Sequence, residues 1–216
     1  MPLVPLSQDL VRRIAQNEKY HDQVITTERL ILRGLRPSEV GIWRRIRSDP
    51  KKNEFGALLE PERPTEQLAT SMEQAVMMDQ IQFFVILKNY EYFHECNLED
   101  GLLIGCIELC EPRYGSTIGG VIHHQVARKG FGTLAFAAVI GYALNDPQRT
   151  SVHLEAKTEN LGCRVMMNRI SPVVESPGTI HAEERDDPEE CVTWTFDKAM
   201  WDKAKGRVAE RHGRFS

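Results

Sequence analysis

The sequence predicts a mixed α/β domain whose sheet is mostly antiparallel and carries helices on its faces. Strand-like segments come first, a single strand–helix–strand crossover follows them, and a helix and a terminal hairpin come last. This order differs from the regular alternation of a doubly wound parallel sheet. The composition agrees with a packed domain, because 41% hydrophobic and 27% charged residues are typical of globular chains and exclude wholesale disorder.

The first part of the chain predicts one strand between helical segments. In the strand, Leu30 and Leu32 share one face. In the helix after it, Val40, Trp43 and Ile46 recur at helical spacing. The predicted elements are an amphipathic helical extension at 7–20, a strand at 27–33, a helix at 37–49 and, after a polar loop, a helix at 65–80.

The second part of the chain predicts the crossover and the hairpin. The continuous apolar run at 83–87 is typical of a central strand. Gly130 opens a helix that Asp146 and Pro147 close, and Asp197 is placed to cap a last helix. The predicted strands are 83–87, 102–109, 117–123, 152–156, 180–183 and 192–196, and the predicted helices are 130–145, 160–169 and a terminal one after Asp197.

One domain with short extensions is expected, because 216 residues are about 1.4 times the roughly 150 residues of a typical domain. We divide the chain into a helical extension at 1–23, a main domain at 24–197 and a helical tail at 198–216. The net charge of -4, from 27 basic and 31 acidic residues, argues against a dedicated nucleic-acid binder.

The sequence lacks the signals of a membrane protein, a secreted protein and a metal site. The longest apolar stretch, 134–144, is shorter than the about 20 residues of a membrane-spanning helix, and Arg12 and Arg13 interrupt any signal-peptide core. The five cysteines are odd in number and form no C-x-x-C pair, which favours reduced thiols in a cytoplasmic protein. Histidines and cysteines do not cluster at ligand spacing, so no metal site is expected.

The segment that points to chemistry lies between Ile118 and Thr133. A predicted strand leads into a loop with Arg128, Lys129 and two glycines, and a helix follows directly. Glycines allow sharp turns that gather main-chain N–H groups, and the first helical turn adds its own N–H groups and partial positive charge. The pattern favours a pyrophosphate cradle. A plain glycine turn with solvent-facing basic residues is the alternative.

Two known phosphate motifs fit this loop less well. A Walker A loop needs lysine after its last glycine, whereas Lys129 precedes Gly130. Gly130, Gly132 and Ala135 satisfy the dinucleotide spacing G-x-G-x-x-A. However, residues 125–129 separate these glycines from the strand, and little chain remains for further parallel units. A nicotinamide site is therefore disfavoured.

In this loop and around it the chain resembles the GNAT superfamily of acyl-CoA-dependent N-acetyltransferases, most closely the branch with ribosomal-protein N-terminal acetyltransferases. The resemblance runs in order from about Thr27 to Phe196. It is carried by TERLILR at 27–33, Ile104-Gly105, Ile118-Gly119, RKGFGT at 128–133, and Asn160 with Cys163. It implies a sheet with splayed central strands. It also implies acetyl-CoA as cosubstrate and no metal.

The resemblance further implies an N-acetyltransferase that moves an acetyl group from acetyl-CoA to a primary amine by direct attack on the thioester. The amine belongs to a small molecule or a polypeptide N-terminus, and a homodimer is left open. The diphosphate would lie on the loop, the pantetheine arm along the fourth strand, and a later helix on its other side. The implied cofactor-binding residues are Val121, Ile122, His123, Arg128, Lys129, Gly130, Phe131, Gly132, Thr133, Asn160 and Cys163.

The catalytic groups are less well marked. Glu108, on a strand that ends near the site, is the first candidate for the general base. His123 is the second, and it is expected to point to the opposite face from His124. The chain has Ala127 where the family's loop usually has Gln or Arg, and methionines where many members place a helix tyrosine. A non-catalytic acyl-CoA-binding protein of the same fold is therefore the alternative function.

Overall fold

The computed structural model describes residues 23–48, 80–89, 102–110, 116–170, 176–180 and 189–212. The predicted helical extension at 7–20 lies outside these ranges, as does the predicted helix at 65–80 apart from Gln80. The division into an extension at 1–23, a main domain and a tail at 198–216 stays a prediction.

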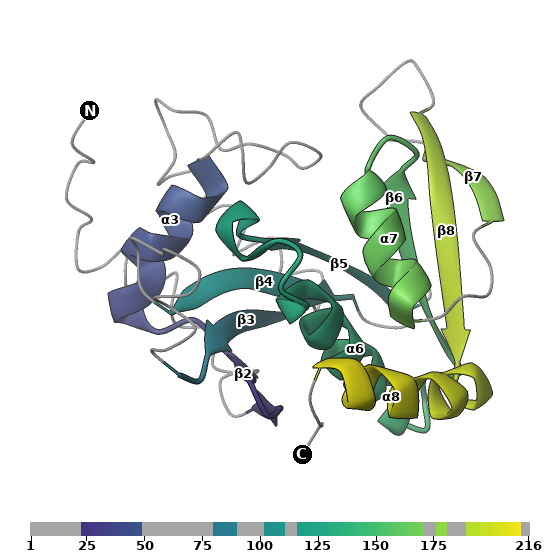
Figure 1. Ribbon diagram of the computed structural model, residues 1–216, viewed down its shortest axis with the longest axis horizontal. Helices are drawn as coiled ribbons and strands as arrows, with labels where there is room; N and C mark the ends of the chain where they lie inside the picture. The colour runs from purple at the N-terminus through teal and green to yellow at the C-terminus, as the bar shows by residue number, and fades with distance from the viewer. Residues whose placement is uncertain are drawn as a thin grey trace.

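The described strands form one eight-stranded sheet, which confirms the predicted mixed α/β fold (Figure 1). Their order in the sheet is β1-β2-β3-β4-β5-β6-β8-β7, and every neighbouring pair is antiparallel except β5 with β6. The strands are β1 (Ile25–Thr26), β2 (Leu30–Arg33), β3 (Ile81–Leu87), β4 (Leu103–Leu109), β5 (Ser116–Ile122), β6 (Ser151–Lys157), β7 (Ser176–Ile180) and β8 (Glu189–Asp197).

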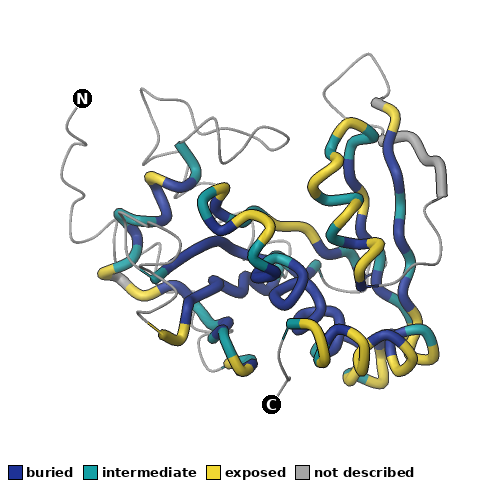
Figure 2. The backbone as a smooth tube through the Cα atoms, in the orientation of Figure 1, coloured by how far each residue is buried: buried dark blue, intermediate teal, exposed yellow. Residues whose placement is uncertain are grey.

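Helices cover both faces of the sheet. The described helices are α3 (Val40–Ser48), α6 (Phe131–Asn145), α7 (Leu161–Ile170) and α8 (Lys198–His212), with 3-10 turns η1 (Pro37–Glu39) and η3 (His124–Val126). Helix α6 is buried over most of its circumference and packs with α7 and α8 on one face of the sheet (Figures 1 and 2). Helix α3 packs on the other face, against β4. We refer to these two sides of the sheet as the α6 face and the α3 face.

The two faces bury separate apolar clusters. In β3, Phe83 and Val85 belong to the cluster under α6, whereas Phe84 and Ile86 belong to the cluster under α3 with Trp43. Successive strand residues point to opposite faces, so a strand that is buried on both sides reads as one unbroken apolar run. All residues of β3 are buried, as its sequence predicts for a central strand.

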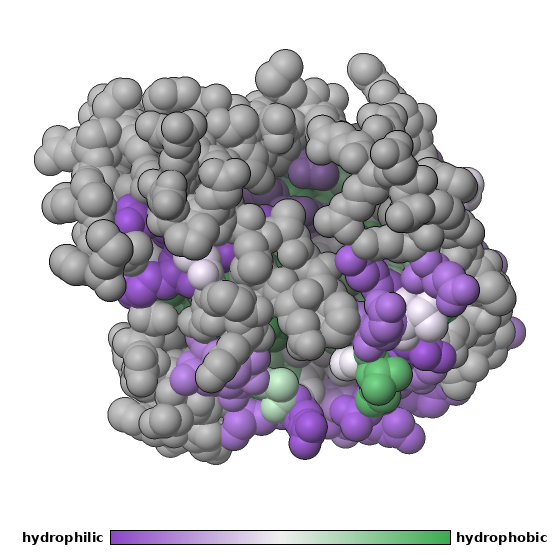
Figure 3. All heavy atoms as spheres, turned by 90° about the horizontal axis from the view of Figure 1, so that it is seen from above, coloured by the Kyte–Doolittle hydropathy of each residue, from purple (hydrophilic) through white to green (hydrophobic). Residues whose placement is uncertain are grey.

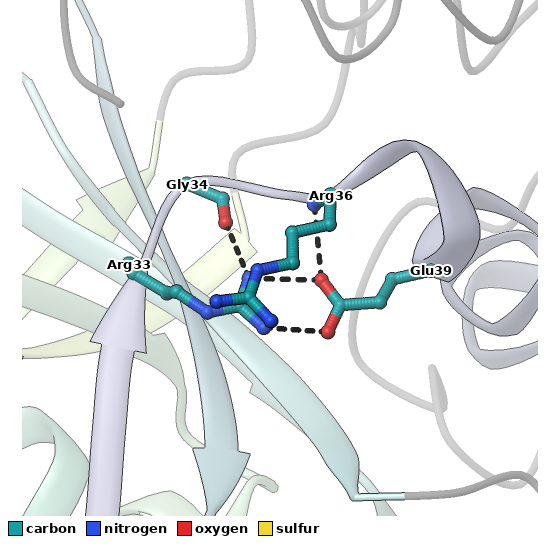
Figure 4. A network of polar contacts seen from close by, with 4 residues as sticks. All are labelled: Arg33, Gly34, Arg36 and Glu39. Atoms are coloured by element: carbon teal, nitrogen blue, oxygen red, sulfur yellow. Dashed lines mark hydrogen bonds and ion pairs between the residues drawn. The ribbon is translucent and has the colours of Figure 1, made fainter. Parts of the chain in front are cut away.

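The polar network in Figure 4 ties the start of α3 to β2. The guanidinium of Arg33 forms a two-pronged ion pair with Glu39, at 2.6 and 2.9 Å, and also donates to the carbonyl of Gly34. The main-chain N–H of Arg36 donates to the same carboxylate at 2.9 Å. The carboxylate therefore fixes the turn that leads from the sheet into the helix.

The terminal hairpin differs from its prediction. Its first strand, β7, ends at Ile180, whereas the sequence predicted a strand beginning there. Pro177 and Gly178 lie within β7, and both residue types argue against a strand. The sheet order explains the exception, because β7 is an edge strand and an edge tolerates proline. The two-residue strand β1 was not predicted either.

Strands β5 and β6 are splayed, as the resemblance implies. They pair in parallel only at Ser116 with Val152 and at Thr117 with His153. Beyond these pairs β5 continues against β4 as far as Ile122, so the other edge of β5 is left open. The edge is exposed at Gly119 and Gly120 (Figure 2). This opening at the centre of the sheet positions the candidate site.

Candidate active site

The open edge of β5 presents main-chain groups at alternate residues. The N–H of Cys110 donates to Thr117, and the N–H of His123 donates to Ile104, so the odd-numbered residues of β5 bond to β4. By this alternation, the N–H and C=O groups of Gly120 and Ile122 face the open edge. An extended ligand could add to the sheet there as a further strand.

This alternation bears on two of the expected cofactor contacts. Val121 and His123 were expected to line the cofactor arm, but their main-chain groups bond to β4. Val121 instead packs its side chain against the cluster on the α3 face. Of the three residues 121–123, Ile122 is the one whose main chain is available to the arm. Its N–H is also the one expected to face a developing oxyanion.

A tight turn connects β5 to α6. The chain passes through η3, which the sequence did not predict, and then through two residues with positive φ, Arg128 at 65° and Gly130 at 84°. Helix α6 begins directly afterwards, with Gly130 at its N-cap and no side-chain cap. The first α-helical bond of α6 runs from the N–H of Leu134 to the carbonyl of Gly130.

The N-terminus of α6 has the properties of an anion site. Because the helical ladder begins at Leu134, the N–H groups of Gly132 and Thr133 precede it and lie in the first turn, where the helix dipole is positive. Arg128 is exposed and Lys129 is partly exposed, so both side chains are accessible to an anion. The side chains of Phe131 and Thr133 are buried, so these two residues offer main-chain groups to a ligand.

Helix α7 forms the other wall beside the loop. A Cβ placed on Gly132 would lie 3.0 Å from the Sδ of Met166 and 3.8 Å from Cγ1 of Ile122. The start of α6, the end of β5 and the middle of α7 therefore meet at one point. The glycine leaves room for this close packing.

Asn160 and Cys163 are hydrogen-bonded to each other at the start of α7. The Oδ1 of Asn160 accepts the N–H of Cys163 at 3.0 Å, in the manner of an N-cap. Burial raises the pKa of the Cys163 thiol to about 11, and the side chain packs against the core. A neutral thiol is a poor nucleophile, so covalent catalysis by Cys163 is disfavoured. No disulfide joins the four cysteines of the described ranges.

Glu108 lies on the α3 face in β4, one strand away from the open edge of β5. Its Oε1 accepts a hydrogen bond from the Nε2 of Gln82, in the neighbouring strand, at 3.2 Å. Gly119 is directly opposite Glu108 in β5, so the carboxylate has no directly opposite side chain in that strand. The carboxylate is partly exposed. Its position is compatible with a general base that is oriented by Gln82.

His123 is less suited to act as a base. Its ring is buried, and its Nδ1 accepts the N–H of Gln125 at 3.1 Å. The neutral ring then carries its proton on Nε2, which leaves no lone pair for a substrate proton. The expectation that His123 and His124 point to opposite faces is wrong, because their rings stack with centroids 5.0 Å apart. Strand β5 ends at Ile122, so strand alternation no longer applies to them.

The structure brings part of the predicted site together. The loop 128–133 and the end of β5 adjoin the middle of α7, at Gly132, Ile122 and Met166. Sequence reasoning missed two residues behind the loop, Arg29 and His212, which come from opposite ends of the chain. Arg29 belongs to the motif at 27–33, but the sequence indicated only a strand-edge position for it.

The face shown in Figure 3 is mostly hydrophilic where its residues are described. On the face shown in Figure 3, hydrophobic surface appears as small separate spots among hydrophilic residues. The large hydrophobic side chains exposed in these ranges are Val24, Leu161 and Val165. Among the described residues, no group of histidine, cysteine and carboxylate side chains is arranged for a metal ion. Within the same ranges, no helix is long and apolar enough to cross a membrane.

The model of the acetyltransferase (GNAT) domain matches residues 29–170, and the chain therefore belongs to the GNAT acetyltransferase family. It is an acyltransferase, and its general reaction is the transfer of an acetyl group to an amine. No curated protein matches the sequence.

Solved structures share the fold at low sequence identity. RimJ from Mycobacterium smegmatis, in complex with CoA-disulfide, is 15% identical, with a TM-score of 0.67, and the match covers 90% of this chain and 96% of that one. Spermidine N-acetyltransferase from Vibrio cholerae, in complex with CoA and spermine, is 15% identical, with a TM-score of 0.59 and coverage of 80% and 97%. A GNAT-family acetyltransferase from Bacillus anthracis is 16% identical, with a TM-score of 0.63 and coverage of 82% and 99%.

Proposed function

We propose that the chain is an acetyl-CoA-dependent N-acetyltransferase that acts on a primary amine, on a small molecule or a polypeptide N-terminus. The observation that carries the proposal is the open edge of β5, which runs directly into the positive-φ turn and the uncapped N-terminus of α6. An extended arm and a diphosphate need these two features side by side. The presence of CoA in two structural neighbours supports acyl-CoA as the donor.

Binding of the donor would rest mainly on main-chain groups. The N–H groups of Gly130, Gly132 and Thr133 would hold the diphosphate, and Arg128 and Lys129 would add charge. Gly120 and Ile122 would bond to the pantetheine arm. Asn160 and Cys163, at the start of α7, would bound the arm on the other side. Phe131 would contribute through its main chain, because its side chain is buried.

The transfer itself needs a neutral amine and a stabilised oxyanion. Glu108 is the candidate base, and such a positioned group typically contributes about 10²–10⁴-fold to the rate. The N–H of Ile122 is the candidate oxyanion donor, and one such donor typically lowers the barrier by about 3 kcal/mol. Acetyl-CoA supplies the thioester that the amine attacks. With Cys163 held as a neutral thiol, no covalent enzyme intermediate is invoked.

A non-catalytic acyl-CoA-binding protein is the second candidate. Ala127 provides no polar side chain at the start of the loop. Met166 and Met167 occupy the positions at which many family members have a tyrosine that acts as general acid. His123 is poorly placed to act as a base, because its Nδ1 accepts the N–H of Gln125. The methionines and the His123 ring weaken the proton relay, and Ala127 leaves the charge at the start of the loop to Arg128 next to it.

One experiment separates the two candidates. Both predict that CoA raises the midpoint of thermal unfolding, but only the enzyme releases free thiol from acetyl-CoA when amines are supplied. We expect thiol release with at least one member of a panel of polyamines, aminoglycosides and N-terminal peptides, and a loss of about 10²-fold or more in Glu108→Gln. CoA binding without thiol release above background hydrolysis would favour the binding protein.

Gly130→Asp tests whether the loop at 128–133 binds the diphosphate. The carboxylate would repel the diphosphate, and the side chain would disfavour the positive φ that Gly130 adopts. We expect weaker CoA binding by isothermal titration calorimetry. An unchanged dissociation constant would contradict the assignment of the diphosphate to this loop.

A further inference from the structure

Arg29 reaches from the turn between β1 and β2 to the back of the candidate phosphate loop. Its Nη1 donates to the carbonyl of Lys129 at 3.3 Å. Its guanidinium lies over the ring of Phe131, with Cζ 4.1 Å from the ring centroid. The side chain of Arg29 therefore contacts two residues of the loop, Lys129 and Phe131, and the first of these lies 100 residues away in the sequence.

The contact with the carbonyl of Lys129 determines where the next N–H points. In a trans peptide the C=O and the following N–H lie in one plane and point in opposite directions. No cis peptide occurs in the described ranges. With the carbonyl of Lys129 held toward Arg29, the N–H of Gly130 points away from Arg29.

The same peptide lies between two strained or unusual backbone conformations. Arg128 adopts a φ of 65°, which is costly for a residue with a side chain, and Gly130 adopts a φ of 84°. Such a conformation persists when its surroundings hold it in place. The contacts of Arg29 with Lys129 and Phe131 supply this restraint at the middle of the turn.

Helix α8 closes another side of Gly130. A Cβ built on Gly130 would lie 2.5 Å from Nδ1 of His212, in the last turn of α8. The Cα of Gly130 is therefore covered by His212, and the carbonyl before it is covered by Arg29. The N–H of Gly130 points away from Arg29.

We propose that Arg29 is a positioning residue that aims the N–H of Gly130 at the diphosphate of the acyl donor, by holding the Lys129 carbonyl and the Phe131 ring. The inference rests on the proposed function. It adds a role for a side chain that lies behind the loop and does not itself touch the donor.

The chemistry of the contact defines the variants. Lysine keeps the charge but lacks the planar group that lies on a ring while it donates to a carbonyl. Methionine keeps much of the length and removes the charge and the donors. Arg29→Lys and Arg29→Met therefore test geometry and charge separately. Arg36→Lys is the matched control, because Arg36 is exposed and near Glu39 in the network of Figure 4.

The experiment measures dissociation constants by titration calorimetry with two probes, CoA and pantetheine, which lacks the diphosphate. We expect both Arg29 variants to weaken CoA binding about tenfold or more and to change pantetheine binding less than twofold, and Arg36→Lys to change neither. A folding defect would appear as a lower midpoint of thermal unfolding and as equal losses for both probes. If Arg29→Met does not fold, Arg29→Lys carries the test.

The outcomes distinguish this inference from the proposed function. Failure of the wild-type protein to bind CoA would overturn both. Wild-type binding with both Arg29 variants within twofold for CoA would overturn the positioning role alone, and so would equal losses for CoA and pantetheine. A loss confined to CoA supports it even if no amine acceptor is found, because the measurement does not depend on turnover.

Discussion

Gly130 has a backbone conformation and surroundings that both disfavour a side chain. Its φ is 84°, and a Cβ would meet the ring of His212 at 2.5 Å. We expect Gly130→Ala to lower the free energy of unfolding by at least about 1–2 kcal/mol, the cost of the left-handed conformation alone. We also expect it to weaken CoA binding. Urea denaturation and calorimetry measure the two effects.

Gly206 is the matched control for that substitution. It lies within α8, and a Cβ there would meet nothing within 4 Å. Alanine is favoured over glycine in a helix interior by about 0.8–1.0 kcal/mol, so Gly206→Ala should stabilise the protein. If both variants changed stability in the same direction, the conformational argument for Gly130 would be wrong.

His212 reports the electrostatic environment of the loop at the residue scale. Burial lowers the pKa of its imidazole, and the charges of Arg169, Arg29 and Arg211 lower it further. Three cationic side chains from three parts of the chain therefore act on one position beside Gly130. A positive potential of this kind attracts an anionic ligand to the loop before any direct contact forms.

At the scale of elements, the connection from β2 into α3 depends on one carboxylate. The side chain of Glu39 is 15% exposed and accepts three hydrogen bonds, two from Arg33 and one from the N–H of Arg36. We expect Glu39→Gln to lower the free energy of unfolding by about 1–2 kcal/mol at pH 7, because the amide cannot accept the same charge-assisted bonds. Chemical denaturation measures this difference.

The same carboxylate predicts how the difference varies with pH. Burial alone would raise the pKa of Glu39, but the hydrogen bonds from Arg33 and Arg36 and the charges of both arginines lower it below 4.5. A lowered pKa stabilises the fold above the ordinary value, and this stabilisation is lost as the pH falls through the lowered value. The wild-type and Glu39→Gln curves should therefore converge in acid.

Asp202 is the control for this element-scale prediction. It pairs with Lys198 and Lys205 on the exposed side of α8. Exposed pairs of this kind are screened by solvent and contribute little. We expect Asp202→Asn to leave the unfolding free energy nearly unchanged at pH 7. Divergence of the Glu39→Gln and wild-type curves in acid would contradict the account of the network.

At the scale of the whole molecule, the sheet consists of two parts joined at β5 and β6. Only two residue pairs connect these strands, whereas β4 pairs with β5 over five and β6 with β8 over seven. Helices α6, α7 and α8 pack together on the α6 face and join the parts there. A ligand in the opening would bond to the main-chain groups of β5 beyond Thr117, which β6 leaves unpaired.

Hydrogen exchange can measure this arrangement amide by amide. We expect CoA to slow exchange at Gly120 and Ile122 about tenfold or more, because their N–H groups face the open edge. The amides of Val121 and His123 already bond to β4 and should change less. NMR-detected exchange with and without CoA tests the alternation. Equal slowing at all four amides would indicate general stabilisation and contradict a strand-like cofactor arm.

Much of the fold could be predicted from the sequence because its signals are local. The buried run of β3 and the cap of α8 are each encoded by neighbouring residues. Asp197 illustrates this, since its Oδ1 accepts the N–H of Met200 at 2.7 Å, as predicted. Strand β7 was misplaced because only its position at the edge of the sheet permits Pro177 and Gly178 within it.

The sequence by itself determined the class of fold, the family resemblance and the glycine loop at 128–133, because hydrophobic periodicity, caps and glycines act over a few residues. The tertiary structure decided which main-chain groups of β5 stay unpaired, which nitrogen of His123 accepts a hydrogen bond, and that Arg29 and His212 both lie beside the loop. These facts depend on strand register and on contacts between distant segments. The physical reason is that strand register and helix packing depend on residues far apart in the sequence, so a local pattern of residues specifies neither of them.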